Sequence, residues 1–322
     1  METYRPTLDH KGMLSFILLA YGLAWLVVSP LWLSGQGLRH PLVGLLLPLM
    51  MWTPALAVLI VTRLISPPPE GLQRATGLVL GRGRGWGWYW LFAWLGIPLL
   101  VLATPFVGAL VGLYTLDLVA FSGFRATLEA AGAGPLLAQT PIQVLVLAQL
   151  ALLPLAPAIN AVFAFGEEWG WRGYLLPRLL SLGQWPALIL SGIVWGLWHM
   201  PVILLGYNYP DHPASGWLLM TAMCVVWGLL FGWTRLATGS VWPAVIAHGA
   251  LNGSAGIVVL LGQAGTPANP ALVGVTGVTG WILPLLIVGG LALSGRLPVP
   301  DAPDLAGQQS GTPARAAPEG AP

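Results

Sequence analysis

Hydrophobic residues run along this chain in long stretches, which are separated by short polar or glycine- and proline-rich segments. Eight stretches are long enough to cross a hydrocarbon layer of roughly 30 Å, for which a helix needs about 20 residues. Backbone N–H and C=O groups inside lipid must be satisfied within the segment, so each stretch is predicted to be a helix. The predicted spans are 13–33, 42–63, 87–114, 142–165, 187–206, 215–234, 241–262 and 272–294.

Several of these spans contain a proline, which lacks a backbone N–H and clashes with the preceding helical turn. Membrane helices tolerate proline where neighbouring groups satisfy the freed carbonyls, so we expect kinks at these positions. The prolines concerned are Pro54, Pro98, Pro154, Pro201, Pro243 and Pro284.

Composition supports a membrane protein. Of 322 residues, 56% are hydrophobic and only 7% are charged, whereas an average soluble domain carries about 25% charged residues. A soluble globule could not cover its surface with so few charges, and disorder needs low hydrophobicity. No basic run is long enough to bind nucleic acid, and Cys224, the single cysteine, can form no disulfide within the chain. We therefore expect an all-α, polytopic membrane bundle of about eight helices, without a nucleic-acid partner.

Basic residues predict the orientation of the bundle, because cytoplasmic loops are enriched in Lys and Arg. With a cytoplasmic N-terminus, eleven basic residues fall inside and only Arg39 and Arg125 fall outside. Both termini are therefore predicted to be cytoplasmic. The bias of arginine over lysine, together with 42 glycines and 29 prolines, suggests a GC-rich bacterial genome and therefore a bacterial cytoplasmic membrane. The eleven inside residues are Arg5, Lys11, Arg63, Arg74, Arg82, Arg84, Arg172, Arg178, Arg235, Arg296 and Arg315.

Ionisable residues at membrane depth cost about 2.5–3.5 kcal/mol each at a helix centre, so their presence suggests function. A first cluster, Glu167, Glu168 and Arg172, follows the fourth predicted span. Glu168 and Arg172 are four residues apart and can pair on one helix face. Glu167 points elsewhere, and an unpaired buried carboxylate can serve as a general base. The simpler alternative is a cluster of interfacial charges.

Two further polar clusters lie in later spans. His199 follows Trp195 by four residues in the fifth span, and His248 precedes Asn252 by four in the seventh. Hydrogen bonds to a carbonyl or between helices would explain either cluster without catalysis. At 1.5 Å per residue, however, His248 and His199 come about 12 Å and 18 Å from the inside face. With Glu167 at the inside end of its span, we expect one cavity that opens to the cytoplasm.

These motifs resemble a known family. Glu-Glu-x-x-x-Arg (Glu167, Glu168, Arg172), aromatic-x-x-x-His (Trp195, His199) and His-x-x-x-Asn (His248, Asn252) follow one another on successive helices. In this order they resemble the CPBP family of CAAX proteases and bacteriocin-processing membrane proteases, which are related to type II CAAX prenyl endopeptidases. Trp195 departs from the phenylalanine that is usual in the family. The resemblance divides the chain into N-terminal helices (1–141), a catalytic core (142–262), a last helix (263–294) and a disordered cytoplasmic tail (295–322).

The resemblance implies an intramembrane endopeptidase that acts near the cytoplasmic side of the membrane. Glu167 would activate water with help from His199, while His248 and Asn252 would stabilise the oxyanion. Glu168, Arg172 and Trp195 would support the site. Glu167, His199 and His248 could instead hold zinc, as in a metalloprotease. Metal-independent chemistry is favoured slightly, because Asn252 is a poor zinc ligand and a good hydrogen-bond donor.

The substrate and two other functions stay open at this point. The implied partners are the lipid bilayer and a peptide or protein, which in the eukaryotic relatives carries a lipid-modified C-terminus. A catalytically inactive scaffold or bacteriocin-immunity factor of the same fold is one alternative. A proton-coupled transporter is the other, although the sequence has no internal repeat of the kind that many transporters show.

Overall fold

The computed structural model of the protein describes residues 9–81 and 85–300, and in these residues it is helical without a β-strand. Every predicted span is helical, which confirms the all-α fold class. Among the described residues, five segments are each long and apolar enough to cross a membrane, and a bent pair makes a sixth when it is taken as one span. The chain is therefore an integral, multi-pass membrane protein, while the count of eight and the orientation stay predictions.

The six segments are built from consecutive helices. Two of the five are built mainly from one helix: α1 (His10–Leu33) and α14 (Gly216–Thr238). A third joins α2 (Val43–Met51), α3 (Thr53–Ile60) and η2 (Val61–Ile65), and a fourth joins α5 (Trp86–Leu91), η3 (Phe92–Gly96) and α6 (Ile97–Leu110). The fifth joins α15 (Trp242–Ser254) and α16 (Ile257–Leu260). The sixth joins α9 (Ile142–Leu152) at a 54° bend to α10 (Ala156–Glu168), η4 (Trp169–Leu175), α11 (Leu176–Leu179) and η5 (Leu180–Leu182).

The other helices are shorter. Two predicted spans correspond to α12 (Gln184–Trp198) with α13 (Met200–Ile203), and to η6 (Val278–Trp281) with α17 (Ile282–Leu293). The connecting helices are η1 (Gly37–Arg39), α4 (Leu72–Ala75), α7 (Ser122–Ala130) and α8 (Gly134–Gln139).

Helix breaks coincide with several of the prolines at which kinks were predicted. Pro154 lies at the 54° bend between α9 and α10, and Pro54 and Pro201 lie in the first turns of α3 and α13. Proline is tolerated in a first helical turn, where no intrahelical partner for the N–H exists. The break before Pro201 leaves His199 at the junction of α12 and α13.

The structure corrects one boundary that matters for the site. The fourth span was predicted to end at residue 165, but the helix continues through η4 and α11 to Leu182. Glu167 therefore lies well inside a helix and not at its end. The charges of this segment suggested a membrane surface, but Glu167, Glu168 and Arg172 are buried against neighbouring helices.

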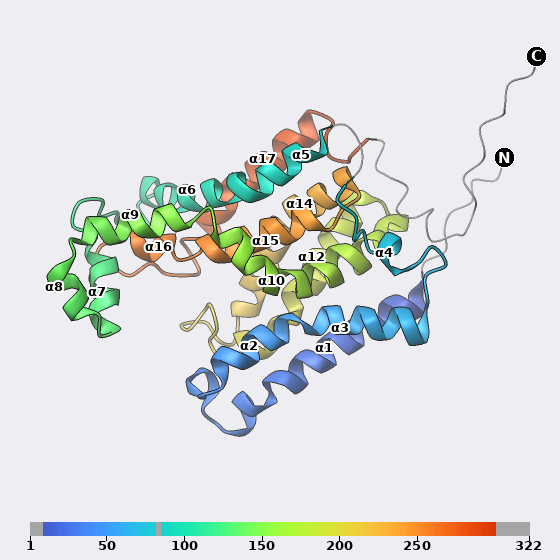
Figure 1. Cartoon of the computed structure of the whole chain (residues 1–322), viewed down its shortest axis with the longest axis horizontal. Helices are drawn as coiled ribbons and strands as arrows, with labels where there is room; N and C mark the ends of the chain where they lie inside the picture. The colour runs from blue at the N-terminus through green and yellow to red at the C-terminus, as the bar shows by residue number, and fades with distance from the viewer. Residues whose placement is uncertain (1–8, 82–84, 301–322) are drawn as a thin grey trace, which may run out of the picture.

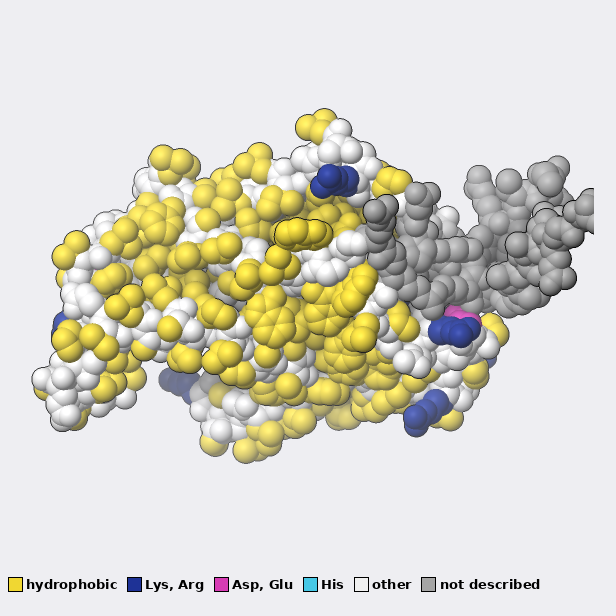
Figure 2. Space-filling model, turned by 45° about the horizontal axis from the view of Figure 1, so that its top comes forward, with side chains coloured by type: hydrophobic (Ala, Val, Ile, Leu, Met, Phe, Trp, Pro, Cys, Tyr) yellow, Lys and Arg dark blue, Asp and Glu magenta, His cyan; other side chains and the backbone are white. Residues whose placement is uncertain are grey.

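The helices run along the long axis of the molecule (Figure 1). The central group, α10, α12, α14 and α15, is flanked by α1–α3 on one side and by α5, α6 and α17 on the other. Helices α7 and α8 lie at one end of the bundle and α4 at the other. Hydrophobic side chains cover most of the face in Figure 2, as expected for a lipid-facing surface.

Close packing of α10 on α15 depends on small residues. A Cβ added at Gly249 would lie 2.7 Å from the Pro157 carbonyl oxygen, so only glycine permits this approach. Small residues near His248 thus allow tight helix packing.

The chain after α17 stays with the bundle for a few residues. Leu297 is buried, and the Val299 N–H donates to Gln184 Oε1 at 2.7 Å. The part of the predicted tail from 295 to 300 is therefore packed, while 301–322 lies outside the described residues. Arg5, Arg82, Arg84 and Arg315 also lie outside them.

Candidate active site

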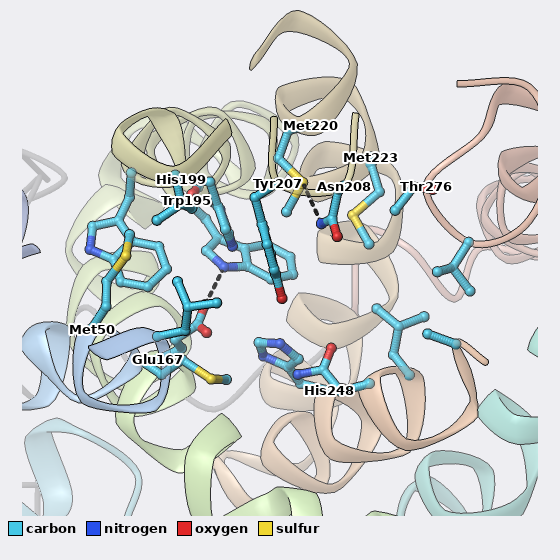
Figure 3. A pocket seen from close by; sticks show the side chains of 18 of the residues that line it. Met50, Glu167, Trp195, His199, Tyr207, Asn208, Met220, Met223, His248 and Thr276 are labelled. Atoms are coloured by element: carbon cyan, nitrogen blue, oxygen red, sulfur yellow. Dashed lines mark hydrogen bonds between the residues drawn. The ribbon is translucent and has the colours of Figure 1, made fainter. Parts of the chain in front are cut away.

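The three polar motifs meet at one cavity of about 320 Å³, which lies among α2, α10, α12, α14 and α15. Figure 3 shows Glu167, Trp195, His199 and His248 pointing toward one another from three of these helices. The structure thus brings together residues that are widely separated along the chain. The cavity lining includes all four candidate catalytic residues, Glu167, His199, His248 and Asn252.

Glu167 is 2% exposed, and among the described residues one hydrogen bond holds its side chain. Its Oε2 accepts from Trp195 Nε1 at 2.6 Å. Among the described residues it forms no ion pair, so Oε1 stays available to the cavity. Gly166 sets its position, because a Cβ there would lie 2.5 Å from the Met51 carbonyl oxygen and push α10 away from α2.

Glu168 has the opposite environment. Its Oε1 lies 2.9 Å from Arg172 Nη1 and 2.9 Å from His248 Nδ1. The first of these contacts confirms the predicted pair. The Arg172 guanidinium also stacks over the Trp195 ring, 4.3 Å from its centroid. Glu168 thus connects the first motif to His248 of the third, and Arg172 connects it to Trp195 of the second. Neither Glu168 nor Arg172 lines the cavity.

His248 is oriented by Glu168 from a helix far along the sequence. Its Nδ1 is engaged with Glu168 Oε1, so Nε2 is the ring nitrogen that remains for the cavity. The ring also packs edge-on against Trp195 and stacks on Phe231. A histidine held in this way by a carboxylate has a defined tautomer and orientation. Asn252 lies one turn further along α15 and is exposed at the cavity.

His199 is fixed by its own helix. Its Nδ1 lies 3.0 Å from the Trp195 carbonyl oxygen, which can only accept, so Nδ1 carries the proton. Nε2 of the neutral ring is then an acceptor. A hydrogen bond to a carbonyl, which would explain His199 without catalysis, is therefore present. It involves Nδ1 and leaves Nε2 for the cavity.

Sequence reasoning missed three polar residues that line the same cavity: Asn160, Tyr207 and Asn208. Asn160 is an amide within an apolar span, seven residues before Glu167 and on the same helix face, which was a usable signal. Tyr207 and Asn208 follow α13 in a loop, and Asn208 has a positive φ of 61°. No helical periodicity marks such loop residues.

Tyr207 extends from that loop into the space between Trp195 and His248 (Figure 3). Burial raises the pKa of its phenol above the ordinary value, and the negative charge of Glu167 raises it further. The hydroxyl therefore stays protonated and can donate a hydrogen bond inside the cavity.

Zinc ligation by Glu167, His199 and His248 stays a prediction. Within residues 9–81 and 85–300, no three His, Cys, Asp or Glu side chains are grouped as metal ligands would be. The Nδ1 atoms of both histidines and Glu167 Oε2 are each bonded to protein atoms, which leaves Glu167 Oε1 and the two Nε2 atoms for the cavity.

The lining of the cavity includes loop residues at one end of the bundle. Tyr207, Asn208 and Thr276 line it from the loops after α13 and before η6. The predicted orientation places both loops outside, and this orientation stays a prediction.

Comparison with known proteins agrees with the motifs. Residues 147–254 match the family described as type II CAAX prenyl endopeptidase Rce1-like. A protein named CAAX prenyl protease 2, from Methanococcus maripaludis, is 35% identical over 92 residues, which are 27% of this chain. The match spans about a third (34%) of the length of that relative. The segment from 147 to 254, which carries all three motifs, therefore belongs to the CAAX-protease (CPBP) family.

Proposed function

We propose that this protein is an intramembrane endopeptidase of the CAAX-protease type that hydrolyses a peptide bond with water activated by Glu167. One observation carries the proposal. Glu167, a carboxylate with no ion pair to any residue that the structure describes, is buried at a cavity that is also lined by two histidines and by Asn252. Structural ion pairs do not need such a carboxylate, whereas general base catalysis does.

Water activation is the first step. Glu167 Oε1 accepts a proton from a water molecule, whose oxygen attacks the carbonyl carbon of the substrate. His199 Nε2 accepts a hydrogen bond from the same water and orients it. The bond from Trp195 keeps Glu167 Oε2 occupied, so Oε1 is the atom directed at the water.

Charge then develops on the carbonyl oxygen of the tetrahedral intermediate. The side-chain amide of Asn252 and the hydroxyl of Tyr207 can donate to this oxygen. His248 donates from Nε2 when both ring nitrogens carry a proton, with Nδ1 held at the Glu168 carboxylate. Preorganised donors of this kind lower the barrier because they need no reorganisation during the reaction.

Collapse of the intermediate completes the reaction. The protonated Glu167 returns its proton to the amide nitrogen of the substrate as the C–N bond breaks. The products are a new C-terminal carboxylic acid and a new amine, and Glu167 is again a carboxylate. Glu168 and Arg172 touch neither water nor substrate in this scheme and act by positioning His248.

The proposed substrate is a peptide or protein segment at the membrane. The relative is named a CAAX prenyl protease, which makes a peptide with a prenylated C-terminal motif the first substrate to try. A farnesylated tetrapeptide-tagged reporter and the membrane peptidome of the host together cover prenylated and unmodified substrates.

Glu167→Gln tests the proposal, with Glu129→Gln on the exposed surface of α7 as the matched control. Loss of a general base lowers rates by about 10²–10⁴-fold, so we expect Glu167→Gln to stop cleavage by protein reconstituted in liposomes. Chelation with phenanthroline should leave the wild-type rate unchanged. Equal peptide products from the wild type and Glu167→Gln would instead support a scaffold or immunity factor without catalysis.

A further inference from the structure

A groove of about 770 Å³ adjoins the cavity that contains Glu167. The groove lies between α7, α16 and the loop that precedes η6, and its volume is within the range of about 300–1,000 Å³ that is usual for ligand pockets. Four residues line both the groove and the cavity, so the two spaces share one boundary. These residues are Asn208, Ala255, Val275 and Thr276.

Hydrogen bonds hold this boundary in place. The Tyr209 hydroxyl donates to the Thr276 carbonyl oxygen at 2.9 Å. Trp227 Nε1 donates to the Val275 carbonyl oxygen at 3.3 Å. Both donor side chains are buried. The loop before η6 is therefore fixed to the segment after α13 and to α14, which places the groove at a defined position beside the candidate active site.

Helix α7 forms another wall of the groove, at one end of the bundle (Figure 1). The N–H of Gly123, in the first turn of α7, donates to the Gly262 carbonyl oxygen at 2.9 Å. A Cβ at Gly123 would lie 2.5 Å from the same oxygen, so glycine permits this close approach. Just before α7, the Asp117 N–H donates to the Leu261 carbonyl oxygen at 2.9 Å. Main-chain contacts therefore fix this wall as well.

The groove differs from the cavity in charge. The cavity is lined by Glu167 and two histidines, whereas none of the residues that line the groove in the described part of the chain is Asp, Glu, Lys, Arg or His. Most of them are glycine, alanine, valine or proline. A charged group that entered the groove would lose its hydration without gaining a charged partner. The groove is therefore suited to an uncharged occupant.

N–H groups at the groove favour a polypeptide over a hydrocarbon chain as that occupant. Ala268 lines the groove between Pro267 and Pro270, and its N–H donates to no other group that the structure describes. The side-chain nitrogen of Asn208, at the boundary with the cavity, has only a weak acceptor within reach among the described residues, the Met220 sulfur at 3.9 Å (Figure 3). Peptide carbonyls can accept from such N–H groups, whereas an isoprenoid chain has no acceptor for them.

The groove is built almost entirely from segments outside the region that matches the family. Of its described lining residues, Asn208 alone belongs to 147–254, and the others come from 114–130 and 255–276. The three motifs all lie within 147–254. The candidate chemistry and the groove therefore come from different parts of the chain, and selection of substrates by the groove is a property that the family match does not cover.

We propose that the groove is a substrate-binding subsite for an uncharged polypeptide segment next to the bond that is cleaved. The segment passes Asn208, whose side-chain amide donates to the backbone of the segment, and then lies between α7 and the loop before η6. Substrates with Asp, Glu, Lys or Arg at these positions are refused. The position of the segment next to a cleaved bond rests on the proposed function, but binding of the segment requires no cleavage.

A charge placed in the groove tests this selection. Ala126 on α7 lines the groove and Ala138 on α8 does not, and both residues are exposed, so each should tolerate aspartate. Peptides that the wild type, Ala126→Asp and Ala138→Asp release from host membranes are sequenced. We expect the wild type and Ala138→Asp to share one window of positions beside the cleaved bond that contains no charged residue. Ala126→Asp should cleave peptides with Lys or Arg in this window roughly tenfold or more faster than the wild type does.

A thiol-protection assay tests binding without cleavage. Thr127→Cys places a thiol at the groove and Ala138→Cys places one outside it, each in Glu167→Gln protein in liposomes, and Cys224 stays in place because it is buried. The probe is acetyl-Val-Ala-Gly-Ala-Val-amide, and its counterpart has Lys in place of Gly. We expect the uncharged peptide to slow maleimide labelling of Thr127→Cys but not of Ala138→Cys. The Lys peptide should slow neither.

Several results would overturn the proposal. Charged residues at every position around the cleaved bond would do so, as would equal selectivity of Ala126→Asp and the wild type. In the labelling assay, equal protection by both peptides or protection by neither contradicts it, and protection by farnesol alone would assign the groove to an isoprenoid chain. Protection in a protein that cleaves no peptide would support the subsite while the protease function fails, and cleavage without protection would mean the reverse.

Discussion

Two arginines of the continuous helix from α10 to α11 pair with a carboxylate, and one of the two pairs lies beside the cavity described above. Glu168 and Arg172 are fully buried and 2.9 Å apart, with His248 as a third member. Asp9 and Arg178 are 3.8 Å apart, and the Asp9 side chain is 28% exposed. Asp9 also accepts hydrogen bonds from the Gly12 N–H and the Ser66 hydroxyl, which tie the start of α1 to the loop before α4.

The difference separates the cluster that we propose to serve catalysis from a structural one. Both clusters contain a buried arginine and a paired acid, so burial of charge does not identify the site. The cluster at the cavity has a second acid, Glu167, whose bonding partner is the neutral indole of Trp195. A carboxylate that is positioned but not neutralised by a cation is the feature that points to chemistry.

The largest effect on stability is expected for Glu168→Gln. Breaking a buried ion pair costs about 3–5 kcal/mol, because the remaining charge is left uncompensated. The change would leave Arg172 buried without its acid and would free the ring of His248. Thermal unfolding of the detergent-solubilised protein measures the loss. A melting temperature equal to that of the wild type would show that the two clusters do not differ in the way described.

Asn252→Ala tests the cavity side of the comparison. Removing one oxyanion donor costs about 10²–10³ in rate, and Asn252 is exposed at the cavity, so the fold should tolerate the change. We expect kcat to fall by about 10² with KM and melting temperature nearly unchanged. Glu129→Gln, outside the cavity and the groove, again provides the control. Equal rates for Asn252→Ala and the wild type would remove Asn252 from the mechanism.

Trp195→Phe tests how Glu167 is positioned. The substitution keeps an aromatic ring under Arg172 and removes the indole N–H that binds Glu167 Oε2. A hydrogen bond to a charged group contributes about 1.5–3 kcal/mol, so we expect kcat to fall by roughly tenfold or more. Trp195→His, which retains a ring N–H, should recover part of the loss if the bond is what matters. A rise in KM with kcat unchanged would instead indicate that Trp195 acts by packing.

Asp9→Asn should have the smallest effect. Partly exposed ion pairs contribute about 0–1 kcal/mol, and asparagine can still accept from the Gly12 N–H as a helix N-cap. We expect a melting temperature within a few degrees of the wild type and unchanged cleavage. A loss of activity comparable to that of Asn252→Ala would mean that the structural cluster is coupled to the cavity.

Part of the site could be predicted because its members are close in sequence. Glu168 and Arg172 pair at the spacing of one helical turn, as expected from the sequence alone. The contacts of Glu167 with Trp195 and of Glu168 with His248 join residues 28 and 80 positions apart. Such contacts depend on how each helix is rotated about its axis, and hydropathy does not specify that rotation.

The end of the fourth span was mispredicted for a related reason. Glu167, Glu168 and Arg172 have the composition of a membrane surface, and a hydropathy pattern cannot distinguish exposed charges from charges buried among helices. Tyr207 and Asn208 were missed because loop residues follow no helical periodicity. Their role became visible only when the loop was placed over His248.

The sequence by itself determined that this chain is a helical membrane protein and that three motifs place polar residues within its helices. It could do so because a bilayer requires long apolar helices and makes each polar residue within them costly. Only the tertiary structure decided that Glu167 is buried beside a cavity without an ion pair among the described residues, and which residues line that cavity with it. Both depend on packing between helices far apart in the chain, which hydropathy does not specify.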